Sequence, residues 1–264
     1  MPELPEVETF VRRLAPIVGA RIVEAEILDP RLGLLPGALC GASIDGVKRR
    51  AKYIVIGLED RGDLVVHLRM SGRLRLDRSE QEIPYTRMIL RLDSGDTVFF
   101  INPRRLGTAV LCKDGFDRRI GIDPTGAAFT PRQFASIVEA SRAPIKQLLL
   151  DQRKIGGIGN IYAAEALWRA GIHPTRPANT LAEEEVRKLH HGITSVLADA
   201  LDQLGTTIGA GISDYRPSAD QNGEFQNHLA VYGRESEACE RCSAPISRIV
   251  QAGRSTYLCP ACQN

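Results

Sequence analysis

Residues 1–14 read MPELPEVETFVRRL, and the interpretation of the whole chain begins with them. An initiator Met followed by a small residue is normally removed, which would leave Pro2 first with a free secondary amine. An α-amino group has a pKa of about 7.7 to 8.0, so a useful fraction is unprotonated and nucleophilic near neutral pH. Attack by such an amine on a sugar C1′ or an aldehyde gives a charged iminium, which makes neighbouring C–H bonds acidic. The stretch therefore predicts amine nucleophile chemistry at Pro2.

The same stretch predicts a helix that would hold the terminal amine in place. Pro5 stands near the first helical position, a site that proline favours, and Gly19 stops the pattern. Apolar residues recur at helical spacing at Val7, Phe10 or Val11, Leu14 and Val18. The alternative is that Pro5, Glu6 and Glu8 are ordinary cap and macrodipole residues without a function.

Composition restricts the class of protein. The 264 residues are 43% hydrophobic and 25% charged, which is typical of a globular protein of about two domains. No apolar run approaches the ~20 residues of a membrane span, and the acidic N-terminus does not resemble a signal peptide. We therefore expect a cytoplasmic protein that binds no membrane. Since the net charge is only +2, a nucleic-acid surface would need clustered basic residues.

Short β-branched segments between Arg21 and about Cys112 predict strands. They are RIVEAEIL, AKYIVIGLE, DLVVHLRMSGRLRL, TRMILRLDSGDTVFF and GTAVLC, and residues 60–63 and 93–96 provide hairpin connections. The N-terminal helix and this array predict a β-sandwich.

Beyond residue 126 the pattern is helical. Helices are expected after the capping box that begins at Thr130, over 144–152, over 158–170, and from Thr180, with Glu183 completing its capping box, to Gly205. The 24 residues 205–228 lack periodicity, and a loop of that length is usually functional or disordered. We predict an α+β chain with a sandwich domain over 1–120, a helical domain over 121–228 and a zinc finger over 229–264.

Four cysteines near the C-terminus have metal-ligand spacing. The pattern is Cys239-x2-Cys242-x16-Cys259-x2-Cys262, in which each pair can hold one side of a tetrahedral metal site. Disulfides are the alternative, but without a secretory signal zinc is preferred. Four thiolates fill the coordination sphere, so the ion would be structural. Residues 248–258 then predict a hairpin with Arg254 at its turn, while Cys40 and Cys112 are expected in the core.

Motifs along the whole chain resemble the formamidopyrimidine-DNA glycosylase family. They are PELPEVE at 2–8, NPRRLG at 102–107, GIGNIYA at 157–163, VYGR at 231–234 and GRSTYLCPACQ at 253–263. The resemblance implies a bifunctional base-excision repair enzyme that removes oxidised purines, notably 8-oxoguanine opposite cytosine and formamidopyrimidines, and cuts the strand at the abasic site. It also implies a β-sandwich, a helix–two-turn–helix domain and a zinc finger, acting as a monomer on double-stranded DNA at the nucleoid.

The resemblance assigns the catalytic roles. Pro2 would attack C1′ of the damaged nucleotide to form a Schiff base, and Glu3 would protonate the sugar as its ring opens. Lys52 matches the lysine that assists β-elimination, and Arg254 matches the finger arginine assigned to δ-elimination and phosphate binding. Without the resemblance, Lys52 would be one basic residue of a solvated edge.

DNA contacts are also implied by the resemblance. They fall on His67, Met70, Tyr85, Arg104, Leu106, Arg142, Lys146, Asn160 and Tyr232. Strand alternation places Met70 on the face of Leu64, Val66 and Leu68, and His67 on the other face with Arg69; a buried structural histidine is the alternative. The glycines before Asn160 leave backbone N–H groups at a helix start, where phosphate binds favourably.

Filling the gap left by an extruded base falls to Met70, Arg104 and the residue two positions after Arg104. The family carries an aromatic residue there, and Leu106 departs from it, although leucine can still serve as an apolar wedge. Tyr85 stands where many members carry histidine. Residues 205–225 correspond to the lesion-capping loop, and they depart from the family pattern around 209–216.

Two other interpretations remain open. One is an endonuclease VIII-like glycosylase for oxidised pyrimidines, which would use the same proline chemistry. Met70 with Arg104, the finger turn and the long capping loop favour the purine-specific branch. The other is a zinc-finger protein that binds damaged DNA without catalysis.

Overall fold

The computed structural model describes residues 1–78, 83–114, 116, 120–207 and 223–264. Contacts divide the chain into two compact units. The first contains residues 1–118 and 204–224, and the second contains 119–203 and 225–264. The division into three domains at residues 120 and 228 stays a prediction.

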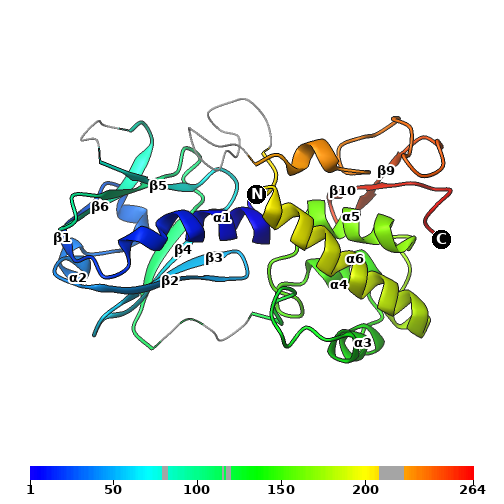
Figure 1. Ribbon diagram of the computed structural model, residues 1–264, viewed down its shortest axis with the longest axis horizontal. Coiled ribbons are helices and arrows are strands. Elements are labelled where there is room, and N and C mark those ends of the chain that lie inside the picture. Colours follow the sequence, from blue (N-terminus) through cyan, green and yellow to red (C-terminus); the bar gives the residue numbers. More distant parts are fainter. Residues whose placement is uncertain (79–82, 115, 117–119, 208–222) are drawn as a thin grey trace. The chain divides into compact units, whose positions relative to one another are not determined.

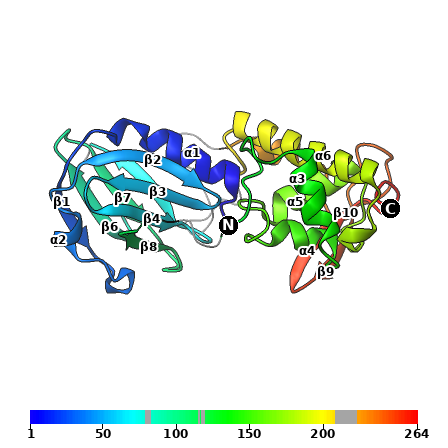
Figure 2. The ribbon, with the colours of Figure 1, turned by 90° about the horizontal axis from the view of Figure 1, so that it is seen from below.

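The first unit is built from two four-stranded antiparallel sheets (Figure 2). One sheet has the order β2-β3-β4-β8, with β2 Ile44–Arg50, β3 Tyr53–Leu58, β4 Gly62–His67 and β8 Thr108–Cys112. The other has the order β1-β6-β7-β5, with β1 Ile22–Ile27, β6 Thr86–Leu92, β7 Thr97–Ile101 and β5 Arg73–Asp77. A short helix, α2, covers Pro36–Leu39. The predicted sandwich is confirmed.

Alternation along the strands produces the core between these sheets. In β6, Met88 and Leu90 are fully buried while the residues between them are partly exposed, which is the two-residue period of a strand with one buried face. Ile54, Ile56, Leu64 and Val66 join the same cluster from the other sheet. Both predicted hairpins form, since β3 pairs with β4 and β6 pairs with β7.

Helix α1, Leu4–Leu14, packs against β2 and β3 of one sheet (Figure 2). It also packs against β5 of the other sheet. Val7, Phe10 and Leu14 are buried as predicted. The helix ends four residues earlier than expected, because Pro16 cannot continue it and a 3-10 turn, Ala15–Ile17, follows. Val18 is therefore exposed, and Ile17 takes the buried position.

Two strand predictions were incomplete. The basic run before Lys52 belongs to strand β2, which we did not predict because its polar residues hide the alternation. The segment 63–76 is two strands, since β4 ends at His67 and the chain turns at Arg69, whose φ is +55°.

The second unit contains four α-helices, α3 Pro131–Glu139, α4 Ile145–Leu150, α5 Asn160–Ala170 and α6 Glu183–Asp202 (Figure 1). The hydroxyl of Thr130 accepts the Gln133 N–H at 3.2 Å, as expected for a cap. The predicted start of α6 was wrong. Thr180 lies in a 3-10 turn, Ala178–Thr180, and the carboxylate that caps α6 is Glu185, which accepts the Ala182 N–H at 2.8 Å.

The C-terminal hairpin consists of β9, Ser247–Gln251, and β10, Arg254–Leu258. It is preceded by a 3-10 turn, Phe225–His228. Our expectation for Cys40 was wrong, because this residue is exposed at the end of α2. In the part of the chain that the structure describes, no helix is both long and apolar enough to cross a membrane.

Candidate functional site

The first candidate site surrounds the N-terminus. Pro2 is buried, and Glu3 is only 3% exposed. Burial lowers the pKa of the Met1 amino group, the charges of Glu3 and Glu6 oppose this change, and Lys52 and Arg104 add to it. The charges that affect this amine come from three separate parts of the first unit. They are the start of α1, the β2–β3 turn and the loop after β7.

Glu6 fixes the beginning of α1. Its Oε2 accepts the backbone N–H of Glu3 at 2.7 Å, and its Oε1 accepts that of Thr206 at 2.8 Å. The side chain is 1% exposed. Gly205, with φ +80°, allows this approach, since a Cβ there would lie 2.7 Å from Glu6 Oε1. The segment entering the predicted capping loop is therefore tied to the N-terminal end of α1, while residues 208–222 of that loop lie outside the described residues.

Lys52 and His67 are both buried, at 4% and 6% exposure. Lys52 is therefore not a residue of a solvated edge. His67 Nδ1 accepts the Arg69 N–H at 3.0 Å, and its ring meets the Tyr53 ring edge-on at 4.5 Å. Burial, with the charges of Arg69 and Lys52, lowers the pKa of His67 to about 4. The imidazole is neutral at pH 7, and its proton is on Nε2.

Residues 102–107 form a loop that exposes Arg104 and Leu106. Arg105 forms a two-bond ion pair with Asp29, with Nε–Oδ2 at 2.8 Å and Nη2–Oδ1 at 2.6 Å. The guanidinium of Arg105 lowers the pKa of Asp29 to about 2. Asn102 closes the loop by donating to Gly107 O at 3.2 Å.

Met70 and Tyr85 are each 44% exposed. Alternation placed Met70 on the face of Leu68, but Leu68 is buried and the turn at Arg69 separates their environments. Tyr85 also has a left-handed backbone, with φ +67°, just before β6. Both side chains are available to a ligand.

The second group of predicted residues belongs to the second unit. Lys146 is 1% exposed, and its Nζ donates to Thr256 Oγ1 at 2.6 Å and to Ser255 O at 3.2 Å. Asn160 donates to the same Ser255 O at 2.9 Å. The two side chains thus hold β10 next to Arg254, which is exposed, as is Arg142.

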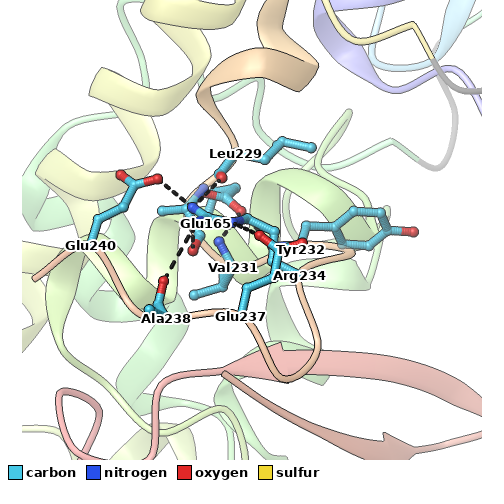
Figure 3. Close-up of polar contacts among 9 residues, drawn as sticks. Glu165, Leu229, Val231, Tyr232, Arg234, Glu237, Ala238 and Glu240 are labelled. Atoms are coloured by element: carbon cyan, nitrogen blue, oxygen red, sulfur yellow. Dashed lines mark hydrogen bonds and ion pairs between the residues drawn. The ribbon is translucent and has the colours of Figure 1, made fainter. Parts of the chain in front are cut away.

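Glu165 of α5 organises the VYGR segment (Figure 3). Its carboxylate accepts backbone N–H groups from Ala230 at 2.9 Å, Val231 at 3.0 Å and Tyr232 at 2.8 Å. Burial raises the pKa of Glu165, and these three amides oppose the change. Arg234 closes the segment by donating to Leu229 O at 3.0 Å and by pairing with Glu237 and Glu240 (Figure 3). Tyr232 is thereby fixed beside Tyr257, with ring centroids 5.2 Å apart.

The four cysteines of the finger converge. Their sulfur atoms all lie within 4.8 Å of one another, with Cys239–Cys262 at 4.0 Å and Cys242–Cys259 at 3.4 Å. A tetrahedral zinc site with Zn–S bonds of about 2.3 Å requires sulfur separations of about 3.8 Å. All six cysteines of the chain are free in the structure. The residues fit a structural zinc ion.

Hydrogen bonds distinguish the sulfurs. Burial raises the pKa of Cys239. The amides of Arg241 and Cys242 and the indole of Trp168 have the larger, opposite effect, so the pKa is lowered to about 6. Burial raises the pKa of Cys259, and a hydrogen bond with Cys242 raises that of Cys262 to about 12. Backbone N–H groups of both cysteine turns therefore donate to the sulfurs that would bind the ion.

Sequence reasoning missed three carboxylates that position the site. Asp29, Glu6 and Glu165 each bind a partner at least 65 residues away, in addition to any local bond. Glu6 had a detectable signal in its capping position three residues after Glu3. Asp29 and Glu165 had none.

The chain is similar to known proteins along most of its length. Residues 1–109 match the family model described as formamidopyrimidine-DNA glycosylase N-terminal domain, residues 120–210 match the H2TH domain of that family, and residues 236–264 match the zinc finger found in FPG and IleRS. A formamidopyrimidine-DNA glycosylase from Roseiflexus sp. (strain RS-1) is 44% identical over 276 residues, covering all of both chains.

Solved structures agree with these matches. The crystal structure of the MutM (Fpg) protein from Thermus thermophilus is 41% identical, with a TM-score of 0.88 and coverage of 99% of this chain and 98% of that one. A Lactococcus lactis Fpg mutant, in complex with DNA that contains Fapy-dG, is 35% identical, with a TM-score of 0.90 and complete coverage of both chains. The resemblance stated from the motifs is confirmed.

Proposed function

The chain belongs to the formamidopyrimidine-DNA glycosylase family, the DNA glycosylases of base-excision repair, and from this premise we propose which lesions it removes and how. It excises oxidised purines, namely formamidopyrimidines and 8-oxoguanine opposite cytosine, from double-stranded DNA, and then cuts the strand at the abasic site. It acts as a monomer at the nucleoid of the cytoplasm. The observation that carries the proposal is that Pro2 and Glu3 are buried at the start of α1. The charges of Glu3, Glu6, Lys52 and Arg104 all affect the adjoining Met1 amino group.

Pro2 is the nucleophile once Met1 has been removed. Its nitrogen attacks C1′, the bond from C1′ to the base breaks, and the proton released by the amine leaves with the base. Glu3 protonates the sugar ring oxygen as the ring opens, which gives the iminium. Pro2 is buried, and burial disfavours the protonated form of an amine, which supports a nucleophilic, unprotonated nitrogen at this step.

Lys52 and Arg254 assist the elimination steps. The iminium acidifies the C2′ proton, and Lys52 assists its removal as the 3′ phosphate leaves. Loss of the 5′ phosphate follows by δ-elimination, to which Arg254 contributes while it binds phosphate beside the lesion. The burial of Lys52 and its electrostatic effect on the terminal amine support its role.

The DNA contacts divide by chemistry. His67 donates a neutral Nε2–H to phosphate, and Asn160 contributes at the start of α5. Met70, Arg104 and Leu106 fill the space of the extruded base, and Tyr85, Arg142 and Tyr232 contact the duplex. Lys146 is buried and bonded to β10, so its effect on DNA runs through the Arg254 hairpin.

A structural zinc ion bound by Cys239, Cys242, Cys259 and Cys262 completes the finger. Bound zinc supplies no reaction step; it fixes the two cysteine pairs and the hairpin between them. The convergence of the four sulfur atoms supports this proposal.

Borohydride trapping tests the central claim. With a duplex that carries 8-oxoguanine opposite cytosine, we expect a covalent adduct that mass mapping places on Pro2. Pro2→Gly should reduce strand cutting by about 1,000-fold or more while DNA affinity changes by less than about threefold, because phosphate contacts lie on other residues.

Several outcomes would contradict this mechanism or the proposed substrate. An adduct on Lys52 would identify Lys52 as the nucleophile in place of Pro2. Equal losses of cutting and binding in Pro2→Gly would assign Pro2 a structural role. A chain that retains Met1 and cuts at full rate would exclude the terminal proline. Faster action on a thymine glycol duplex would favour the pyrimidine branch, and binding without any adduct would favour a non-catalytic binder.

A further inference from the structure

Gln152 lies at the beginning of the turn that connects helix α4 to helix α5. Its side-chain oxygen, Oε1, accepts the backbone N–H of Gly157 at 2.9 Å. Its side-chain nitrogen, Nε2, donates to the carbonyl oxygens of Ile158 at 2.7 Å and Leu150 at 3.1 Å. The amide thus uses its oxygen as an acceptor and both of its N–H groups as donors. One side chain therefore joins the last residue of α4 to the segment that begins α5.

The two halves of this turn are held by different groups. The first half, up to Gly156, forms main-chain hydrogen bonds of 2.8 to 3.1 Å with residues 121–122. The second half, residues 157–159, contains two glycines and is bonded by the Gln152 side chain. The φ of Gly157 is +101°, a conformation that glycine adopts readily. Since glycine also adopts many others, a contact must select the direction of these peptide groups.

The bond to Ile158 sets the direction of an amide at the start of α5. The carbonyl of Ile158 and the N–H of Gly159 belong to one planar trans peptide group, in which they point in opposite directions. Because Gln152 holds the carbonyl, the N–H of Gly159 points away from Gln152. Gly159 is the N-cap residue of α5, and as a glycine it has no side chain to orient the first amides of the helix. Gln152 therefore fixes the backbone at a helix N-terminus, the kind of place where phosphate binds favourably.

We propose that Gln152 is a positioning residue for DNA binding, whose side-chain amide holds residues 157–159 in the conformation that presents the start of α5 to a phosphate. The proposal rests on the DNA contact proposed above for Asn160. Gln152 acts through the backbone of its neighbours, so it affects binding and not the bond-breaking steps. Each phosphate contact contributes about 0.9 to the slope of log affinity against log salt concentration, which gives the loss of one contact a measurable signature.

Gln152→Met tests this role, because methionine keeps the length and neutrality of the side chain and removes the amide. Affinity for an undamaged duplex is measured by fluorescence anisotropy at several salt concentrations. At ~0.1 M salt we expect affinity to be about tenfold lower than in the wild type, with a salt slope smaller by about 0.9, so that the two extrapolated affinities converge near ~1 M. Gln133→Met, at an exposed glutamine of α3, is the matched control and should change neither quantity.

A general loss of structure would give a different set of results. Zinc content and urea unfolding are measured for both variants, and excision is followed in a single turnover with enzyme in excess over a duplex that carries 8-oxoguanine. Saturating enzyme compensates for weaker binding, so the single-turnover rate of Gln152→Met should stay within about threefold of the wild-type rate. Unchanged affinity, an unchanged salt slope, or an excision rate that falls as much as affinity does would overturn the proposal.

Hydrogen exchange in the wild type needs no variant, so it decides the question even if Gln152→Met fails to fold. Gln152 is only partly buried, so slow exchange of its side-chain N–H groups would report their hydrogen bonds and support the proposal. Rapid exchange of these groups or of the Gly157 amide would overturn it. A wild-type protein that does not bind the duplex would remove the proposed function as well. Normal binding by the wild type with no effect of Gln152→Met would remove this inference alone.

Discussion

Arg104 and Arg254 are two exposed arginines presented by short turns that are held in different ways. The loop of Arg104 is anchored by the ion pair between Arg105 and Asp29. The hairpin of Arg254 is anchored by buried Lys146 and leads directly into the four-cysteine cluster. The first anchor uses charges that the chain supplies itself, whereas the second, with the structural zinc proposed above, depends on an ion taken from solution. The two turns should therefore fail under different conditions.

Both turns need an anchor because both contain a residue in a costly conformation. Arg105 has φ +54°, and Ala252, in the turn of the hairpin, has φ +46°. A non-glycine residue in this region costs about 1–2 kcal/mol, which must be balanced by contacts elsewhere. Removing the anchor should release the turn.

The largest effect is expected from Cys259→Ser. Loss of one ligand removes zinc, and with it folding energy that reaches ~10 kcal/mol or more in small zinc domains, so the hairpin should lose its order. We expect DNA affinity to fall about 100-fold or more in a gel-shift titration. Cys40→Ser, at an exposed cysteine outside the cluster, is the control. A metal-free Cys259→Ser protein with unchanged affinity would show that the hairpin needs no ion.

Lys146→Met should have a smaller effect on the same turn. The substitution keeps the length of the side chain and removes the donor to Thr256 and Ser255, at a cost of about 1–3 kcal/mol. Zinc should remain bound, while DNA affinity falls about tenfold because Arg254 is less fixed. Lys188→Met, on the exposed side of α6, serves as the control. Loss of zinc in Lys146→Met would mean that the hairpin bonds of Lys146 and the zinc site are not separable.

Local patterns predicted much of this architecture, and distant polar partners account for what they missed. The alternation in β6 and the C-x2-C spacing each lie within a few residues, so one sequence reveals them. Asp29 and Arg105 are 76 positions apart, and Glu165 binds amides that carry no side-chain signal. Burial of Lys52 was likewise invisible in its basic run, since the turn after β2 decides it.

For the loop of Arg104, the informative substitution is Asp29→Asn. Asparagine keeps the shape and removes the charge that pairs with Arg105, and hydrogen bonds to charged groups contribute about 1.5–3 kcal/mol. We expect a loss of stability toward urea in that range, with zinc content unchanged. Asp96→Asn is the matched control, because its partner Arg78 is 79% exposed and such surface pairs contribute little to stability. Equal losses of stability in both variants would show that the Asp29–Arg105 pair stabilises the protein no more than an exposed pair does.

Acid should produce the smallest and most gradual difference between the turns. The pKa of Asp29 is lowered from 3.8 to about 2 in the folded protein, chiefly by its hydrogen bond with Arg105. A lowered pKa means that the ion pair stabilises the fold fully above about pH 4, and that this contribution disappears as the pH falls through 2. Zinc release requires only that thiolates become protonated, so it should occur at higher pH than loss of the ion pair. Metal release and unfolding are followed in parallel acid titrations of the wild type and of Asp29→Asn. Metal release should occur at a higher pH than the unfolding that differs between the two proteins. The reverse order would show that the ion pair is the weaker of the two anchors.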